Sequence, residues 1–180
     1  GIDASHPDLA QRVAHNMKLV EVGAPVGDII VPSEQLPYNN SDTSSGHGTH
    51  VAGIVAADNT DGKVLGVAPG ASLVGYGTGD AIFVFGAVSA FNHMISKKDE
   101  WNIRVVNNSW GSSFRLFDPE EPINQATKRA HDAGITVVFA AGNASTEMAI
   151  NPYSVAPWVI SVGNGTLNHQ RNATSSGGLE

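Results

Sequence analysis

The stretch GHGTHVAGIVAA at residues 46–57 decides the fold, because it places a histidine at the start of a helix made largely of small residues. Gly46 and Gly48 on either side of His47 allow the backbone to turn tightly. The alanine, glycine and valine residues that follow can pack closely against a sheet while His47 stays accessible. Such a histidine is suited to proton transfer, and a purely structural histidine at a helix start is the alternative.

Two further segments each consist of an expected buried strand that ends in residues suited to a functional site. IRVVNNSWG at residues 103–111 and ITVVFAAGN at residues 135–143 are rich in β-branched residues and end in small or amide side chains. Short apolar strands alternate with helical patterns along the chain, which predicts an α/β fold with a mainly parallel sheet. Open parallel sheets place ligand sites at the carboxyl ends of their strands, where Ser109 and Asn143 are expected.

The positions of apolar residues, glycines and prolines along the chain give the boundaries of the expected elements. Residues 11–45 contain several glycines and prolines and no clear period, so we expect a surface insertion without regular structure. Helices are expected at residues 47–57, 80–97 and 122–133, and strands at residues 72–76, 104–107, 136–140 and 159–162.

These segments, together with GIDASHPDL at residues 1–9, resemble the subtilisin-like serine proteases, or subtilases (peptidase S8), in both chain order and spacing. The resemblance implies a three-layer subtilisin-like fold with a mainly parallel sheet. It also implies that residues 1–180 are the middle part of a catalytic domain that is incomplete at both ends. Residues 179–180 look like a cloning scar.

The resemblance assigns roles to single residues. His47 matches the general base of the family, and Asn143 matches the amide that donates to the oxyanion. A fixed donor of this kind stabilises charge that exists only in the transition state. The backbone of Ser109, Trp110 and Gly111 matches the wall of the first specificity pocket, although Trp110 replaces the usual leucine, so substrate preference is not carried over. A simple turn residue is the alternative reading of Asn143.

The other two members of the catalytic triad have no match in this sequence. In the family the orienting aspartate comes just before the segment that begins here with Gly1, and the nucleophilic serine lies in a Gly-Thr-Ser motif that this chain lacks. We therefore expect a fragment that carries the base and the oxyanion donor only. Asp3 lies on the turn beyond the aspartate position, where loop hydrogen bonding is its expected role.

A calcium site is a separate question. Residues 58–66 take the place of the family's calcium loop, and Asp8 matches a position that binds structural calcium in many relatives. Asp8 and Asp61 are the candidate ligands of a site that needs six to eight oxygen atoms. Thr60 stands where an asparagine is usual and Lys63 adds a positive charge, so a hydrogen-bonded acidic turn is the alternative. The resemblance implies a hydrolytic reaction that requires no cofactor.

Composition limits the classes of partner. The chain has 180 residues, is 41% hydrophobic and contains no cysteine, so we expect one core without disulfides. The net charge of −7 argues against nucleic acid or an anionic membrane as partner. No signal peptide is visible, and the extracellular location that we expect comes from the family alone. The expected partners are peptide or protein substrates.

Three functions remain open at this point. The chain is a fragment of a serine endopeptidase, a weak esterase in which Ser109 replaces the missing nucleophile beside His47, or an inactive module that binds peptides. Because the strand with the aspartate and the helix with the serine are expected to be missing, we also expect exposed apolar surface. The chain should then form a homo-oligomer or bind a complementing fragment.

Overall fold

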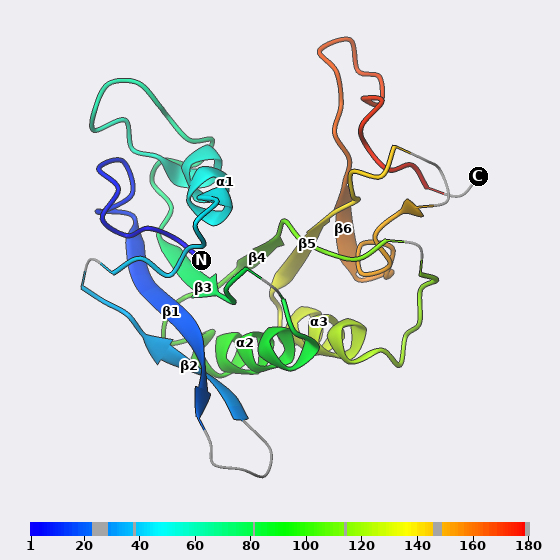
Figure 1. Ribbon diagram of the computed structural model, residues 1–180, viewed down its shortest axis with the longest axis horizontal. Helices are drawn as coiled ribbons and strands as arrows, with labels where there is room; N and C mark the ends of the chain where they lie inside the picture. The colour runs from blue at the N-terminus through cyan, green and yellow to red at the C-terminus, as the bar shows by residue number, and fades with distance from the viewer. Residues whose placement is uncertain (23–28, 38, 81, 114, 146–148, 179–180) are drawn as a thin grey trace. The chain divides into compact units, whose positions relative to one another are not determined.

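The computed structural model describes residues 1–22, 29–37, 39–80, 82–113, 115–145 and 149–178. These residues belong to two units, Gly1–Ala90 and Phe91–Glu180. The order of strands is β2-β1-β3 in the sheet of the first unit and β4-β5-β6 in the sheet of the second (Figure 1).

The sheet of the first unit mixes two strand directions. β1 (Val13–Val22) pairs antiparallel with β2 (Ile29–Glu34) and parallel with β3 (Leu73–Gly77). In the parallel pair Asn16 lies opposite Gly75, and a Cβ atom at Gly75 would meet Asn16 Oδ1 at 2.6 Å. Glycine is therefore needed at this point of β3, because a side chain would displace the buried amide beside it.

β1 and β2 overturn the expectation that residues 11–45 have no regular structure. Val13 and Met17 of β1 are buried, at 8% and 4% exposure. The sequence misled because its glycines and prolines are spread over the whole range: some come between the two strands, Pro32 lies inside β2 and Pro37 follows it. Pro32 lies within β2, which pairs only with β1 among the described strands, and an edge strand tolerates a residue without an N–H group.

Asn16 connects this sheet to distant parts of the first unit. Its side chain is fully buried, and its Nδ2 donates to the carbonyl oxygens of Ile2 (3.0 Å) and Asn39 (2.7 Å). Its Oδ1 accepts a 2.5 Å bond from Ser41 Oγ. A buried amide is stable only when its donors and acceptor are paired, and here they are.

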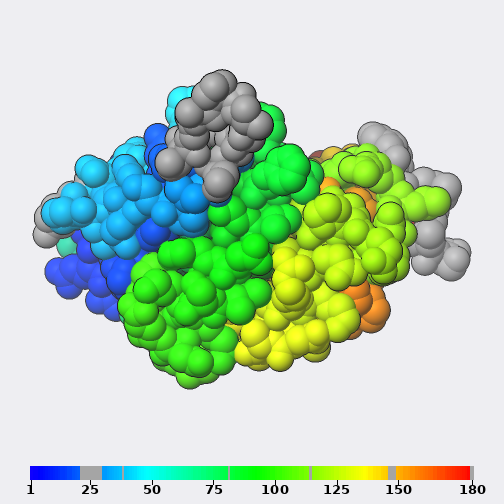
Figure 2. Space-filling model, turned by 90° about the horizontal axis from the view of Figure 1, so that it is seen from below, coloured from blue at the N-terminus to red at the C-terminus, as the bar shows by residue number. Residues whose placement is uncertain are grey.

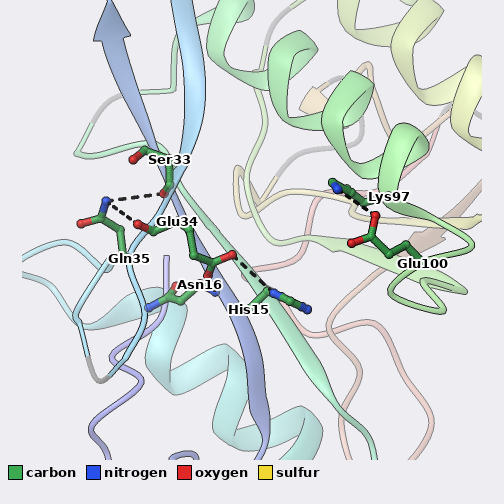
Figure 3. A network of polar contacts seen from close by, with 7 residues as sticks. All are labelled: His15, Asn16, Ser33, Glu34, Gln35, Lys97 and Glu100. Carbon is green, nitrogen blue, oxygen red and sulfur yellow. Dashed lines mark hydrogen bonds and ion pairs between the residues drawn. The ribbon is translucent and has the colours of Figure 1, made fainter.

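On β2, Glu34 joins two adjacent residues of β1. Its carboxylate accepts from Asn16 N at 2.9 Å and lies 3.4 Å from His15 Nδ1 (Figure 3). Burial, and after it the charge of Glu34, raises the pKa of Tyr76 on β3. Glu34 thus fixes the pairing of β2 with β1 through side-chain bonds in addition to the backbone ladder.

The helices begin and end close to the expected residues. α1 spans His47–Ala56, and α2 spans Val84–Lys97, so the expected start of α2 at residue 80 is four residues early. The chain still turns at Gly79, whose φ of 80° lies outside the helical region. The buried positions of α2 recur at helical spacing and are Ala87, Ala90, Phe91 and Met94. Its outer surface, in green, faces the viewer in Figure 2.

The second unit is built on a parallel sheet. β4 (Val105–Asn108), β5 (Thr136–Ala140) and β6 (Val159–Val162) run in the same direction, and α3 (Pro122–Asp132) contacts β5. Parallel strands are usually covered on both faces and read as apolar runs. This pattern explains why the last two strands lie where the sequence predicts them and β4 only one residue later.

The α/β class with a mainly parallel sheet is confirmed. Among the strand pairs that the structure describes, β1–β3, β4–β5 and β5–β6 are parallel and β1–β2 is antiparallel. The described helices include none with the length and apolar character that a bilayer crossing requires.

Candidate active site

His47 is the first residue of α1, and its side chain is exposed. Gly46 precedes it in a left-handed conformation with φ 67° and gives the helix no side-chain cap. Asp42 supplies the cap from outside the helix. Its Oδ1 accepts from Gly48 N at 3.3 Å, and its Oδ2 accepts from Thr49 N at 2.7 Å and from Thr49 Oγ1 at 2.5 Å.

Asp42 was not found by sequence reasoning, and its geometry shows why it matters. The first N–H groups of a helix have no partner within the helix, and a carboxylate there is favoured by both hydrogen bonding and the helix dipole. Burial acts to raise the pKa of the Asp42 carboxyl, but the bonds from Thr49 and Thr43 outweigh it and hold this pKa below its ordinary value. The available signal was an acidic residue shortly before a helix start.

Thr49 links this cap to the beginning of the chain. While its hydroxyl donates to Asp42, it accepts from Asp3 N at 2.9 Å. The carboxylate of Asp3 in turn accepts from Ser5 N and Ser5 Oγ at 2.9 and 2.6 Å. The expected loop-bonding role of Asp3 is therefore confirmed.

Close packing holds α1 in place, as its small residues suggest. Ala52 and Ala56 are buried, at 6% and 0% exposure. A Cβ atom at Gly66 would meet the backbone nitrogens of Ala56 and Ala57 at 2.6 Å, and one at Gly48 would collide with the carbonyl oxygen of Gly1. Gly48 lets the backbone of Gly1 approach the first turn, which carries His47, and Gly66 lets the following loop approach the end of the helix.

The second unit contains the predicted oxyanion donor and the predicted substrate-binding residues. Ser109, Trp110 and Gly111 follow β4, and Asn143 follows β5, which is its neighbour in the sheet. The carboxyl ends of adjacent parallel strands lie at one edge of a sheet, so the structure brings these two segments together. The side chain of Asn143 is exposed, and Ser109 Oγ accepts from Asn107 Nδ2 at 3.0 Å.

Aromatic packing fixes the segment after β4. The ring of Trp110 lies 5.0 Å from the ring of Phe139 and 5.9 Å from that of Tyr153, measured between centroids. Phe139 is fully buried in β5. Trp110 therefore faces inward against the sheet, and its backbone is held at the strand end.

The loop that carries Asn143 is fixed by Ser176. Ser176 N donates to the carbonyl oxygen of Gly142 at 2.9 Å, and Ala144 N donates to Ser176 Oγ at 3.0 Å. Gly142 has φ 110°, a conformation that favours glycine, and a Cβ atom there would meet Ser176 Oγ at 2.8 Å. Both neighbours of Asn143 are thus held by the same serine. His47 belongs to the first unit, whereas these residues belong to the second.

The two candidate calcium ligands lie close together. Asp8 is buried, and its Oδ1 accepts from Asp61 N at 3.2 Å. The carboxylate of Asp61 lies 3.2 Å from Lys63 Nζ, and its pKa is lowered chiefly by the hydrogen bond from Lys63. Among the residues that the structure describes, no three or more His, Cys, Asp or Glu side chains form a group that could hold a metal ion. The carboxylates alone do not fit a calcium site of six to eight oxygens.

Comparisons with known proteins agree with this arrangement. The structure resembles sphericase with a TM-score of 0.76 at 29% identity, covering 98% of this chain and 56% of that one. It resembles the S41 psychrophilic protease with a TM-score of 0.74 at 27% identity, again over 98% and 56%. These neighbours define a subtilisin-like α/β fold.

The sequence comparisons give the family. The model of the subtilase family matches residues 1–180, and the chain therefore belongs to that family. It is 34% identical to subtilisin E of Bacillus subtilis (strain 168) over 188 residues, which is 100% of this chain and 42% of that protein. It is 30% identical over 148 residues to the major intracellular serine protease of the same strain. The chain thus spans about half the length, or less, of these relatives.

Proposed function

We propose that the protein is a serine endopeptidase in which His47 is the general base and Asn143 the oxyanion donor. The observation that carries this proposal is the exposed imidazole of His47 at the first residue of a helix whose start is fixed by Asp42. Family membership over all 180 residues supports it. The segment of Ser109, Trp110 and Gly111 would then hold the substrate backbone beside Asn143.

The reaction follows from these roles. A serine hydroxyl attacks the peptide carbonyl carbon while His47 accepts its proton, and the carbonyl oxygen becomes an oxyanion that the Asn143 amide stabilises. His47 then gives the proton to the leaving amine, and water releases the acyl group by the same steps in reverse. The proposal assigns the nucleophilic serine and the orienting aspartate to polypeptide outside these 180 residues, so this chain alone should not turn over peptides.

The test compares two histidines of one helix in the protein as its gene encodes it. His47→Ala should lower kcat on a peptide substrate by about 10⁴-fold or more, because triad members act as a unit. His50→Ala is the matched control, since His50 is also exposed on α1, and its kcat should stay within about twofold, as for other surface substitutions. Equal losses in both variants would show that helix stability, and not proton transfer, was affected.

A fluorophosphonate label separates the other two functions. If the protein is a serine endopeptidase, the label should bind a serine in the complete gene product and no serine in the 180-residue chain by itself. A labelled Ser109 would support the esterase with a substitute nucleophile, and binding of peptides without any labelled serine would support the inactive binding module. Isothermal calorimetry with a peptide measures that last outcome.

Substrates and location belong to the same proposal. The substrates are peptides or proteins, as the family implies, and the site of action is outside the cell. The relatives include a major intracellular serine protease, so the location is tested by measuring the activity in the medium and in the cell extract of the source organism. Most of the activity in the extract would contradict an extracellular enzyme.

We further propose that residues 58–66 form a hydrogen-bonded acidic turn. The Oδ1 atom of Asp58 accepts from Thr60 N and Thr60 Oγ1 at 3.2 and 2.6 Å, and Lys63 N donates to Asp61 at 3.1 Å. The melting temperature should then be the same in calcium chloride and in EDTA, with magnesium chloride as the control for ionic strength. An increase specific to calcium would reveal a site, because a ligand that binds only the native state stabilises it.

A further inference from the structure

The side chain of Asn151 lies between the two strand ends that carry the proposed site. It is 2% exposed, and its Nδ2 donates to the carbonyl oxygen of Trp110 at 3.1 Å and to that of Ala140 at 2.9 Å. Trp110 follows β4, and Ala140 is the last residue of β5. One amide group therefore spans both segments.

The Asn151 amide connects the two strands beyond the point where their backbone pairing ends. The last paired residues of β4 and β5 are Asn108 and Phe139, so Trp110 and Ala140 lie beyond the described pairing of these strands. A buried carbonyl oxygen without a partner costs free energy. The two donors of Asn151 satisfy both carbonyls at once and so fix the separation of the strand ends.

The other polar groups of Asn151 are also held by hydrogen bonds. Its Oδ1 accepts from Tyr153 N at 3.2 Å and, at a longer 3.5 Å, from Ser112 N. Its own backbone N–H donates to the carbonyl oxygen of Ala141 at 2.8 Å. A Cβ atom at Gly111 would collide with the Asn151 amide, so this glycine leaves the space that the amide fills.

We propose that Asn151 is the positioning residue that aligns the Asn143 amide with the substrate-binding backbone of Ser109, Trp110 and Gly111. This inference rests on the proposed peptidase function. Asn143 lies three residues beyond Ala140, and Ala141, between them, is bonded to Asn151 through its carbonyl. A displacement of about 1 Å at a reacting group can lower the rate about 10²-fold, so the position of this strand end matters for catalysis.

The experiment replaces the amide group of Asn151 in the full-length gene product. Asn151→Asp keeps the size and the acceptor bonds but removes both donors. We expect kcat, per active site titrated with a fluorophosphonate, to fall at least about 10-fold while KM changes less than about threefold, because the oxyanion donor acts only in the transition state.

Asn124→Asp is the matched control. Asn124 is 1% exposed, and its Nδ2 donates to the carbonyl oxygen of Asp118 at 2.7 Å, at the start of α3 and away from the strand ends. This variant should lose thermal stability in the same way as Asn151→Asp but keep its kcat within about twofold, since it displaces no reacting group. Equal kinetic losses in the two variants would overturn the proposal. If Asn151→Asp does not fold, Asn151→Ser, which keeps one donor, takes its place in the comparison.

A double-mutant cycle tests whether Asn151 acts through Asn143. In an Asn143→Ala background, Asn151→Asp should change kcat by no more than about twofold, since coupled residues are not additive. A full additional loss would mean that Asn151 acts independently of the oxyanion donor, and would overturn the proposal.

Hydrogen exchange separates this inference from the proposed function. Amides of residues 110–112 and 140–144 should exchange faster in Asn151→Asp than in Asn124→Asp, whether or not the protein hydrolyses peptides. Unchanged exchange at these residues would overturn the positioning role. If the wild-type protein does not hydrolyse peptides, the peptidase function fails, and the exchange result still decides whether Asn151 holds the strand ends.

Discussion

Asp42 determines the start of the helix that presents His47, and its contribution depends on pH. Asp42→Asn should lower the free energy of unfolding at pH 7 by about 1 kcal/mol, the usual loss for a helix cap. Because the folded-state pKa of Asp42 is lowered, its stabilisation is present above the unfolded pKa of about 3.9 and is lost as the pH falls through the folded value. Wild type and variant should therefore converge in acid.

Urea unfolding at pH 7 and at pH 3 or below measures this difference. Asp80→Asn is the control, because Asp80 is an exposed aspartate of the same unit and caps no helix described here. A constant difference between Asp42→Asn and wild type across this pH range would mean that the carboxylate charge does not stabilise α1.

Residues of the site could be predicted where a short sequence pattern around them indicates their role, and not where their partners are distant in sequence. His47 and the strand-end Asn143 lie in short patterns of glycine and apolar residues, and the structure places them at a helix start and after a strand. Asn151 gives no such signal, because its partners Trp110 and Ala140 lie 41 and 11 residues away in sequence. Only the folded chain shows what its amide contacts.

At the level of elements, α3 offers a test of capping in the second unit. The Glu121 carboxylate accepts from Ile123 N at 2.8 Å and Asn124 N at 3.2 Å, and Pro122 lies at the first helical turn. Glu121→Ala should lower the free energy of unfolding by about 1 kcal/mol, since these N–H groups lose their partner. Thermal or urea unfolding measures the loss.

Glu120→Ala is the matched control for this prediction. Glu120 is exposed, and in the described part of the chain its side chain does not contribute to the cap of α3. The control should unfold like the wild type. If both substitutions had the same effect, the loss would come from net charge and not from the cap.

The elements also show what sequence patterns miss. β5 and β6 are short apolar runs bounded by turns, so they were predicted correctly. β1 was missed because His15, Asn16 and Lys18 interrupt its apolar residues. Asn16 is buried nonetheless, since Ile2, Asn39 and Ser41 satisfy its amide, and those partners come from outside the strand.

For the whole chain, exposed apolar surface predicts association. Ile160 and Val162 of β6 are 54% and 51% exposed, and Val67 is 88% exposed. Strands of parallel sheets are normally covered, and an open strand edge can pair with another chain. We expect the 180-residue chain by itself to form oligomers or to bind the remainder of its domain as a separate piece.

Light scattering over a range of concentrations measures this association. Replacing Ile160 and Val162 together by threonine should reduce it, because threonine keeps the β-branched shape and removes apolar area. A compact monomer at every concentration would show that the chain covers its own apolar surface, and would contradict the prediction.

The strand pairs also differ in when they can form during synthesis. β1 and β2 are neighbours in sequence and pair as a hairpin, whereas α3 lies between the parallel strands β4 and β5. Closing a long loop costs more chain entropy than closing a short one, so parallel pairing is slow. The ribosome releases the hairpin early, while β4 stays unpaired until α3 and β5 have been translated. That interval is when chaperones and proteases have their best access to the nascent chain.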